Sequence, residues 1–389
     1  MANDFDRVFL RDGSSSLKYD ARLSTFGRRD VLPLWVADMD FASPDVVQRA
    51  LSERAAHPIY GYSLPSESLY EVLIGWLGAR HGWVVAREWI VLCPGVVPSL
   101  SAAVMALCQP GDGVIVQPPV YAPFLSAPER TGRKSRLNPL KLEDGRYHFD
   151  LDDFERCAAD GARLLLLCSP HNPVGRVWHK QELQALLEIC QHYGVTVVAD
   201  EIHADLTYPG SQHVPLAVLA QNKVKVVTAV APSKTFNIPG LGLSALIVPD
   251  TSDRAAIGKA FDILHVSTAN PFSLAAFEAA YRAGAPWLDD LLAYLATTRD
   301  FVRDFVQQHL PRIKLIEPEG TYLLWLDCRA LGLDDQQLKQ FFVQKAGVGL
   351  SPGVLFGAQG SGFMRMNIGA PRSIIAQALE NIACALQER

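Results

Sequence analysis

Between about Ile90 and Val248 the chain alternates short apolar runs with longer segments of helical period, and this alternation restricts its fold most. Runs rich in Val, Ile and Leu that are too short for helices predict strands buried on both faces of a parallel sheet, with helices as crossovers. Six runs are candidate strands, at 90–92, 114–117, 164–168, 195–200, 224–229 and 245–248. We therefore predict an α/β fold.

The segment between the third and fourth candidate strands has one apolar face. Its apolar residues recur at helical spacing, at Leu183, Leu186, Leu187 and Cys190. This spacing predicts an amphipathic helix, and the two strands with the helix between them form a βαβ crossover.

The pattern changes after Pro286. A long helical segment runs to about Leu310, two strand-like runs follow at 313–316 and 321–327, and an apolar stripe from Ile374 to Leu386 predicts a last helix. We predict a large domain at 46–285 and a smaller α+β domain at 286–389. The N-terminal segment at 1–45 is expected to pack on the small domain.

Charge and composition exclude several classes of function. The formal net charge is −5, from 36 basic and 41 acidic residues, so no strong positive field is available for nucleic acid. Charged residues interrupt positions 1–20, and no apolar run approaches the ~20 residues of a membrane span. We expect no membrane partner and a cytoplasmic location. The seven scattered cysteines have no metal-ligand spacing, so we expect reduced thiols and no metal site.

Lys234 is the strongest candidate for chemistry. It follows a predicted buried strand, in a context of small and apolar residues. Burial disfavours the charged form of lysine, and a lowered pKa suits an amine that forms an imine with an aldehyde. The alternative is a surface lysine in a loop after the strand.

Two polar groups are predicted to end neighbouring strands. Asp200 follows the run at 197–199, and the carboxyl ends of parallel strands are where such sheets bind ligands. A carboxylate there could keep a pyridine nitrogen protonated, or it could be a helix N-cap. Asn172 lies in a run rich in turn residues and could donate to a phenolic oxygen, although the run alone indicates only a turn.

Five motifs together resemble the large domain of fold-type I pyridoxal-5'-phosphate (PLP) enzymes, the aspartate aminotransferase superfamily. Their order and spacing fit that family, at 94–97 (PGVV), 118–121 (PPVY), 172–175 (NPVG), 200–201 (DE) and 233–234 (SK). Four further motifs resemble the MalY/PatB-type cystathionine β-lyase branch, at 35–41 (WVADMDF), 59–62 (IYGY), 233–237 (SKTFN) and 319–322 (EGTY). The resemblance implies a mostly parallel seven-stranded sheet in the large domain.

The resemblance also implies roles for single residues. Lys234 would bind PLP and move the Cα proton, Asp200 would pair with the pyridine nitrogen, and Tyr121 would stack on the ring. Asn172 would bond its phenolic oxygen, and His203 stands where a tyrosine commonly does so. The phosphate would meet Gly95, Val96 and Val97 at a helix start, the hydroxyl of Ser233, and Tyr60 from a second subunit. Arg365 would grip the substrate carboxylate, with Asp38 as a further substrate-binding residue.

Like His203, a second position departs from the aminotransferase pattern. Transaminases of the superfamily usually carry a phosphate-binding arginine eight residues beyond the lysine, where this chain has Gly242. Arg365 has an alternative of its own, as a surface arginine on an edge strand.

The implied function is a PLP-dependent carbon–sulfur β-lyase. It would act as a homodimer on cystathionine or related S-substituted cysteines, releasing a thiol, pyruvate and ammonia. One alternative is an aminotransferase of the same family, because the site would support several fates of the same carbanion. A lesser alternative is a PLP-fold protein used for regulation or binding.

Overall fold

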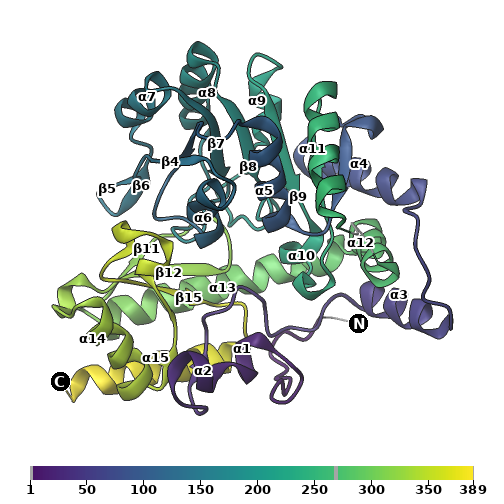
Figure 1. Ribbon diagram of the computed structural model, residues 1–389. Helices are drawn as coiled ribbons and strands as arrows, with labels where there is room; N and C mark the ends of the chain where they lie inside the picture. The colour runs from purple at the N-terminus through teal and green to yellow at the C-terminus, as the bar shows by residue number, and fades with distance from the viewer. Residues whose placement is uncertain (1–2, 267–269, 389) are drawn as a thin grey trace.

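A computed structural model describes residues 3–266 and 270–388 and contains a seven-stranded sheet (Figure 1). The strand order is β2–β10–β9–β8–β7–β3–β4, and only β10 runs against its neighbours. The strands are β2 (Ile90–Cys93), β3 (Gly113–Val116), β4 (Lys134–Leu137), β7 (Ala162–Cys168), β8 (Thr196–Asp200), β9 (Val226–Val230) and β10 (Ser244–Ile247). The predicted mostly parallel sheet is confirmed, and six of its strands overlap the predicted runs.

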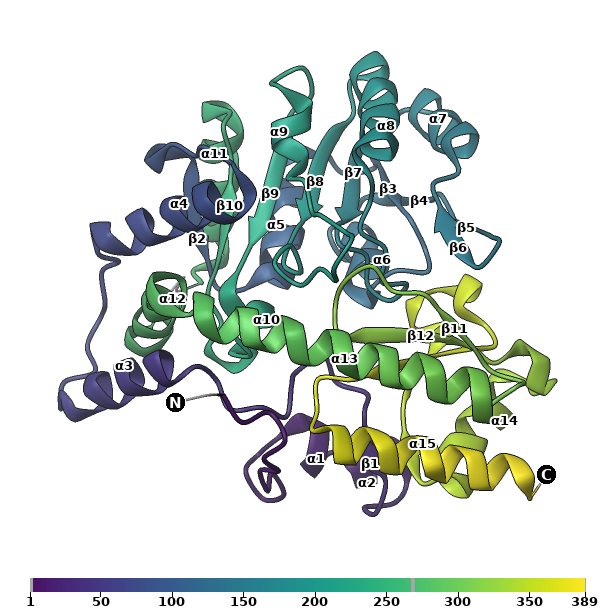
Figure 2. The ribbon, with the colours of Figure 1, turned by 180° about the vertical axis from the view of Figure 1, so that it is seen from behind.

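Helices cover both faces of this sheet (Figures 1 and 2). One face packs against α5 (Val96–Leu107) and α11 (Thr251–Leu264), and the other against α7 (Leu151–Ala159), α8 (Lys180–Tyr193) and α9 (Leu216–Ala220). Successive side chains of a strand point to opposite faces, so Leu164 and Leu166 of β7 join the first layer while Leu165 and Leu167 join the second. The sheet is therefore buried on both sides, as its apolar runs predict.

A second, antiparallel sheet lies in the C-terminal part. Its order is β11 (Lys314–Ile316), β12 (Leu323–Asp327), β15 (Phe363–Asn367) and β14 (Ser351–Pro352). The long α13 (Ala285–His309) runs from beside the large sheet to this smaller one, next to α15 (Arg372–Gln387) (Figure 2). The smaller α+β part is confirmed.

The N-terminal segment is tied to the C-terminal part of the chain. β1 (Leu32–Pro33) pairs in parallel with β13 (Val348–Gly349). The domain boundaries after residues 45 and 285 stay a prediction.

The other α-helices and β-strands differ widely in length. They are α1 (Leu17–Asp20), α2 (Arg22–Phe26), α3 (Asp45–Ala56), α4 (Glu67–His81), α6 (Ala122–Arg130), α10 (Pro232–Thr235), α12 (Pro271–Ala283), α14 (Asp335–Gln340), β5 (Lys141–Glu143) and β6 (Arg146–His148). Within residues 3–266 and 270–388, no helix combines the length and the apolar character that crossing a bilayer requires.

Candidate active site

The residues predicted to carry chemistry meet at one edge of the large sheet. β2, β3, β7, β8 and β9 run the same way, so the segments that follow them lie at the same edge. These segments enclose a cavity of about 260 Å³. Nine predicted residues line it, namely Gly95, Val96, Val97, Tyr121, Asn172, Asp200, His203, Ser233 and Lys234.

A larger cavity adjoins the first one. Its volume is about 1000 Å³, and both cavities are lined by Lys234, Tyr121 and Ala37. Asp38 and Arg365, the predicted substrate-binding residues, line the larger cavity. Tyr60 lines neither cavity and is 58% exposed.

Lys234 lies in the one-turn helix α10, directly after β9. Its Nζ donates to the carbonyl oxygen of Ala37 at 2.7 Å. Burial lowers the pKa of Lys234 to about 8, and the positive charge of Arg365 acts in the same direction. The side chain keeps some accessible surface because it faces the two cavities. The surface-loop alternative is therefore wrong.

Asp200 ends β8 and is 5% exposed. Burial raises the pKa of this carboxyl to about 7, against a hydrogen bond from the backbone N–H of Ile202 at 3.1 Å. The N-cap alternative is wrong, because the residues after Asp200 form turns and the next helix, α9, begins at Leu216. A buried carboxylate of this kind is stabilised by a cation placed against it.

The start of α5 provides free backbone donors. The N-cap residue is Gly95, which has no side chain to accept a hydrogen bond from the first turn. The N–H groups of Val96 and Val97 therefore have no side-chain cap from this residue. Gly242 lines the same cavity with φ at +49°, and a Cβ there would lie 3.3 Å from the carbonyl oxygen of Pro94. The position suits glycine because a larger side chain would be strained and crowded.

Arg365 lies on β15, which pairs with strands on both of its sides and is not an edge strand. The residue is 5% exposed. Nη1 donates to Asn172 Oδ1 at 3.1 Å, and Nη2 donates to the carbonyl oxygen of Trp35 at 2.7 Å. Burial lowers the pKa of Arg365 to about 10. The alternative of a surface arginine on an edge strand is wrong.

One group of charges near Asp38 was missed by the sequence analysis. Arg11 donates to Asp38 at 2.7 Å and to Asp40 at 2.5 Å, while the fully buried Lys18 donates to Asp40 at 2.7 Å. Arg11 and Lys18 looked like ordinary surface charges of the N-terminal segment. No local signal marks them, because their partners are more than twenty residues away.

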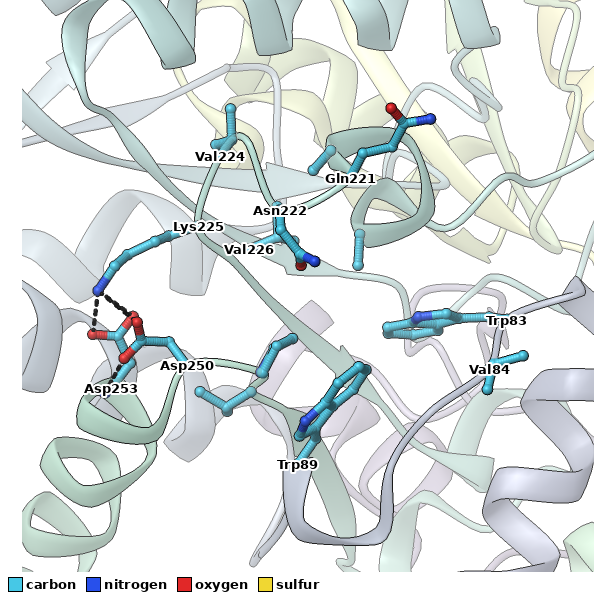
Figure 3. A pocket seen from close by; sticks show the side chains of 14 residues that line it. Trp83, Val84, Trp89, Gln221, Asn222, Val224, Lys225, Val226, Asp250 and Asp253 are labelled. Atoms are coloured by element: carbon cyan, nitrogen blue, oxygen red, sulfur yellow. Dashed lines mark hydrogen bonds and ion pairs between the residues drawn. The ribbon is translucent and has the colours of Figure 1, made fainter.

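A cavity of about 500 Å³ lies at the opposite edge of the sheet. Figure 3 shows the side chains that line it. It is lined by Trp83, Trp89 and Asn222, and Lys225 at its side pairs with Asp253 at 3.1 Å. This edge is where β9 begins, whereas Lys234 follows the end of β9. The cavity is therefore not part of the candidate active site.

The smaller cavity fits PLP, the cofactor expected from the sequence. Buried polar atoms without partners are uncommon, yet His203 Nδ1, on a residue that lines this cavity, has none within residues 3–266 and 270–388. The buried Asp200 has no cation hydrogen-bonded to it among the described residues, and a protonated pyridine nitrogen would supply one. Free N–H groups at the start of α5 suit a phosphate.

Comparisons with known proteins also indicate a PLP site. The sequence model of the family "Aminotransferase class I and II" matches residues 29–382. The chain is 44% identical to "Cystathionine beta-lyase PatB" of Bacillus subtilis, over 98% of this chain and 100% of that protein. Among solved structures, a PLP-bound putative aminotransferase from Clostridium difficile matches with a TM-score of 0.97 at 38% identity, covering 99% and 100% of the two chains. Cystalysin from Treponema denticola, which contains pyridoxal 5'-phosphate, matches with a TM-score of 0.94 at 36% identity over all of both chains.

Proposed function

This chain belongs to the aminotransferase class I and II family, and from that premise we propose that it acts as a PLP-dependent carbon–sulfur lyase of the cystathionine β-lyase type. The observation that carries the proposal is a lysine of lowered pKa that shares a cavity with a buried aspartate. The choice of C–S cleavage is supported by the full-length identity of 44% to a cystathionine β-lyase.

We assign the small cavity to the cofactor. Lys234 would hold its aldehyde end, Asp200 its ring nitrogen and Tyr121 its ring face, and Asn172 and His203 would lie near its phenolic oxygen. Val96, Val97 and Ser233 would bind the phosphate without a cationic side chain. When bound, PLP supplies an aldehyde that reacts with amines and a ring that draws electron density from the α-carbon of an amino acid.

The protein's own groups would then bind the substrate and move its protons. Arg365 has two-sided contacts to Asn172 and Trp35 that hold its guanidinium plane, so it can orient the substrate carboxylate. Lys234 Nζ takes the proton from Cα. The electron pair released there forms the Cα–Cβ double bond as the C–S bond breaks, and the sulfur leaves as a thiolate.

The proposed substrates are cystathionine and related S-substituted cysteines. After the thiolate leaves and takes up a proton, one water molecule would hydrolyse the remaining enamine, so the products would be a thiol, pyruvate and ammonia. The test is to incubate the PLP-loaded protein with cystathionine and no keto acid, and to measure pyruvate and free thiol. Release of both supports the lyase, and the Lys234→Ala variant should give neither. Turnover that depends on an added keto acid would instead show an aminotransferase and overturn the proposal.

We also propose a homodimer. Four large apolar side chains in the segment that joins α3 to α4 are strongly exposed, at Ile59, Tyr60, Tyr62 and Leu64. This segment runs along the outside of the molecule in both views (Figures 1 and 2). So many exposed apolar residues within six positions are typical of an interface. A second copy covering this segment would allow Tyr60 to reach the neighbouring phosphate site.

A further inference from the structure

Asp205 is a buried carboxylate with no part in the chemistry described above. It lies five residues after Asp200, in the loop that follows β8, and it is 8% exposed. Its two oxygens contact three side chains from two other elements. Trp76 Nε1 donates at 3.1 and 3.3 Å, His81 Nε2 lies at 2.9 Å, and Thr235 Oγ1 donates at 2.8 Å.

These contacts join three pieces of the chain, one of which carries the reactive amine. Trp76 and His81 belong to α4, Thr235 belongs to α10, and Asp205 itself is on the loop that begins at Asp200. Burial pushes the pKa of Asp205 upward, but the hydrogen bonds from His81 and Thr235 and the charge of His81 outweigh it, so the pKa lies below its ordinary value. Asp205 is therefore ionised at neutral pH, and hydrogen bonds to a charged acceptor are stronger than neutral ones.

Helix α10 needs such an anchor. It spans only Pro232–Thr235, and one turn of helix is unstable without tertiary contacts. Thr235 is 1% exposed and directly follows Lys234. Its bond to Asp205 holds one side of the turn, while the bond from Lys234 Nζ to Ala37 holds the amine itself.

The other end of the Asp200 loop is anchored independently. Glu201 accepts from the backbone N–H of Leu216 at 2.9 Å, and its other oxygen lies 2.9 Å from His213 Nε2. With Glu201 and Asp205 both fixed, the loop is held on both sides of the turns that follow Asp200. Asp205 thus ties the segment that carries Lys234 to the segment that carries Asp200.

We propose that Asp205 is a positioning residue for Lys234, acting through the hydroxyl of Thr235 to hold α10 in register with Asp200. The inference rests on the proposed role of Lys234 in binding PLP and moving the Cα proton. Its effect is geometric, because the charges that shift the pKa of Lys234 come from Arg365, Asp38 and Asp200.

Two variants of Thr235 test the link. Thr235→Val keeps the shape but removes the donor, and Thr235→Ser keeps the donor. The first readout needs no turnover and is the rate at which the apo-protein captures PLP, followed by absorbance. We expect Thr235→Val to be slower by at least about fivefold, because the amine is held less precisely, and Thr235→Ser to stay within about twofold. Asp205→Asn should behave like Thr235→Val.

The second readout is steady-state turnover of an S-substituted cysteine with hydrogen or deuterium at Cα. We expect Thr235→Val to lower kcat by about tenfold with KM within about threefold, and to enlarge the isotope effect on kcat, since proton transfer becomes slower. Tyr147→Phe is the control for general destabilisation. It removes a buried hydroxyl that accepts from Trp325 Nε1 at 3.2 Å, and Tyr147 lines neither of the two site cavities.

The outcomes separate this inference from the proposed function. The inference would be overturned if apo Thr235→Val captured PLP at the wild-type rate and the fully PLP-loaded variant had the wild-type kcat. It would also be overturned if Tyr147→Phe, with the same melting temperature as Thr235→Val, showed equal losses. If Asp205→Asn does not fold, the Val and Ser variants at position 235 still decide. If the wild type cleaves no C–S bond, the proposed function fails, while slower PLP capture by Thr235→Val, with Thr235→Ser unaffected, still supports the positioning role.

Discussion

Burial of Lys234, together with the positive charge of Arg365, sets the pH range in which its amine reacts. The neutral form attacks an aldehyde, and the pKa of Lys234 is lowered to about 8. Capture of PLP by the apo-protein should therefore accelerate as pH rises through about 8 and level off above it. Removing the positive charge in Arg365→Gln should raise the pKa of Lys234 and move the midpoint to higher pH.

Stopped-flow absorbance between pH 6 and 10 measures both midpoints. Met364→Leu, the neighbouring position on β15, is a volume-conserving control that should leave the midpoint unchanged. A wild-type rate that is still rising steeply at pH 10, toward the ordinary lysine value of about 10.4, would contradict the assignment.

Asp200 lowers the free energy of unfolding of the apo-protein at neutral and higher pH. Its pKa rises from 3.8 to about 7 on burial, so the charged form is disfavoured in the folded state. That cost is absent below pH 3.8 and is complete above pH 7. Asp200→Asn should therefore stabilise the apo-protein at pH 8 by up to about 4 kcal/mol, with little gain at pH 4. Urea unfolding at the two pH values measures this, and a gain that is equal at both would contradict it. The same variant should lose activity.

The sequence was enough to locate residues that directly follow strands. It was not enough to locate residues whose burial depends on long-range contacts. Lys234, Asp200 and Asn172 could be placed because apolar runs precede them, and parallel strands bring their ends together. Asp205 and Lys18 could not, because their burial depends on partners from distant positions that no local pattern reveals. Arg365 was placed by resemblance, and its interior position on β15 came only from the structure.

Close backbone contacts join the loop that carries Asn172 to residues 318–320, which precede β12. Gly175 has φ at +74°, its carbonyl oxygen accepts from the N–H groups of Glu319 and Gly320, and a Cβ there would lie 2.8 Å from Pro318. Gly194, at the end of α8, has a similar φ of +68° but open space around it. The pair therefore separates the cost of backbone strain from the cost of a clash.

Gly194→Ala should lower the free energy of unfolding by about 1 kcal/mol, from strain alone. Gly175→Ala should cost about 2–4 kcal/mol, because Pro318 or the loop must also move. Urea unfolding of the PLP-loaded proteins measures both. Gly175→Ala should also raise KM, because Asn172 positions Arg365. Equal destabilisation in the two variants would show that the loop moves without cost, and it would contradict the predicted clash with Pro318.

Elements were predictable where their apolar pattern was strong. The predicted helix after Pro286 corresponds to α13, and the final apolar stripe corresponds to α15. The edge strand β4, with the sequence KSRL, was not predicted as a strand because its residues are polar and partly exposed. Helix α10 was not predicted either, because four residues are too few to show a helical period of apolar residues. Tertiary contacts hold this turn in place.

Across the whole molecule, Tyr60 is the one proposed cofactor ligand that the fold leaves outside both cavities of its own chain. Its hydroxyl donates to the carbonyl oxygen of Ala55 at 2.7 Å, and its ring lies 5.7 Å from that of Phe272. The segment around it exposes apolar surface that a second copy would cover. Each active site of the proposed dimer would therefore combine Lys234 from one chain with Tyr60 from the other.

Hybrid dimers test this arrangement directly. In a dimer of one Lys234→Ala chain and one Tyr60→Ala chain, one site combines the intact Lys234 with the intact Tyr60, and the other site has neither. Each parent dimer should be inactive or weak in PLP binding and turnover. The hybrid, co-expressed with two affinity tags and purified through both, should recover about half of the wild-type activity because one of its two equivalent sites is complete. If Tyr60 acted within its own chain, no site in the hybrid would be complete and activity would not exceed half that of the Tyr60→Ala parent.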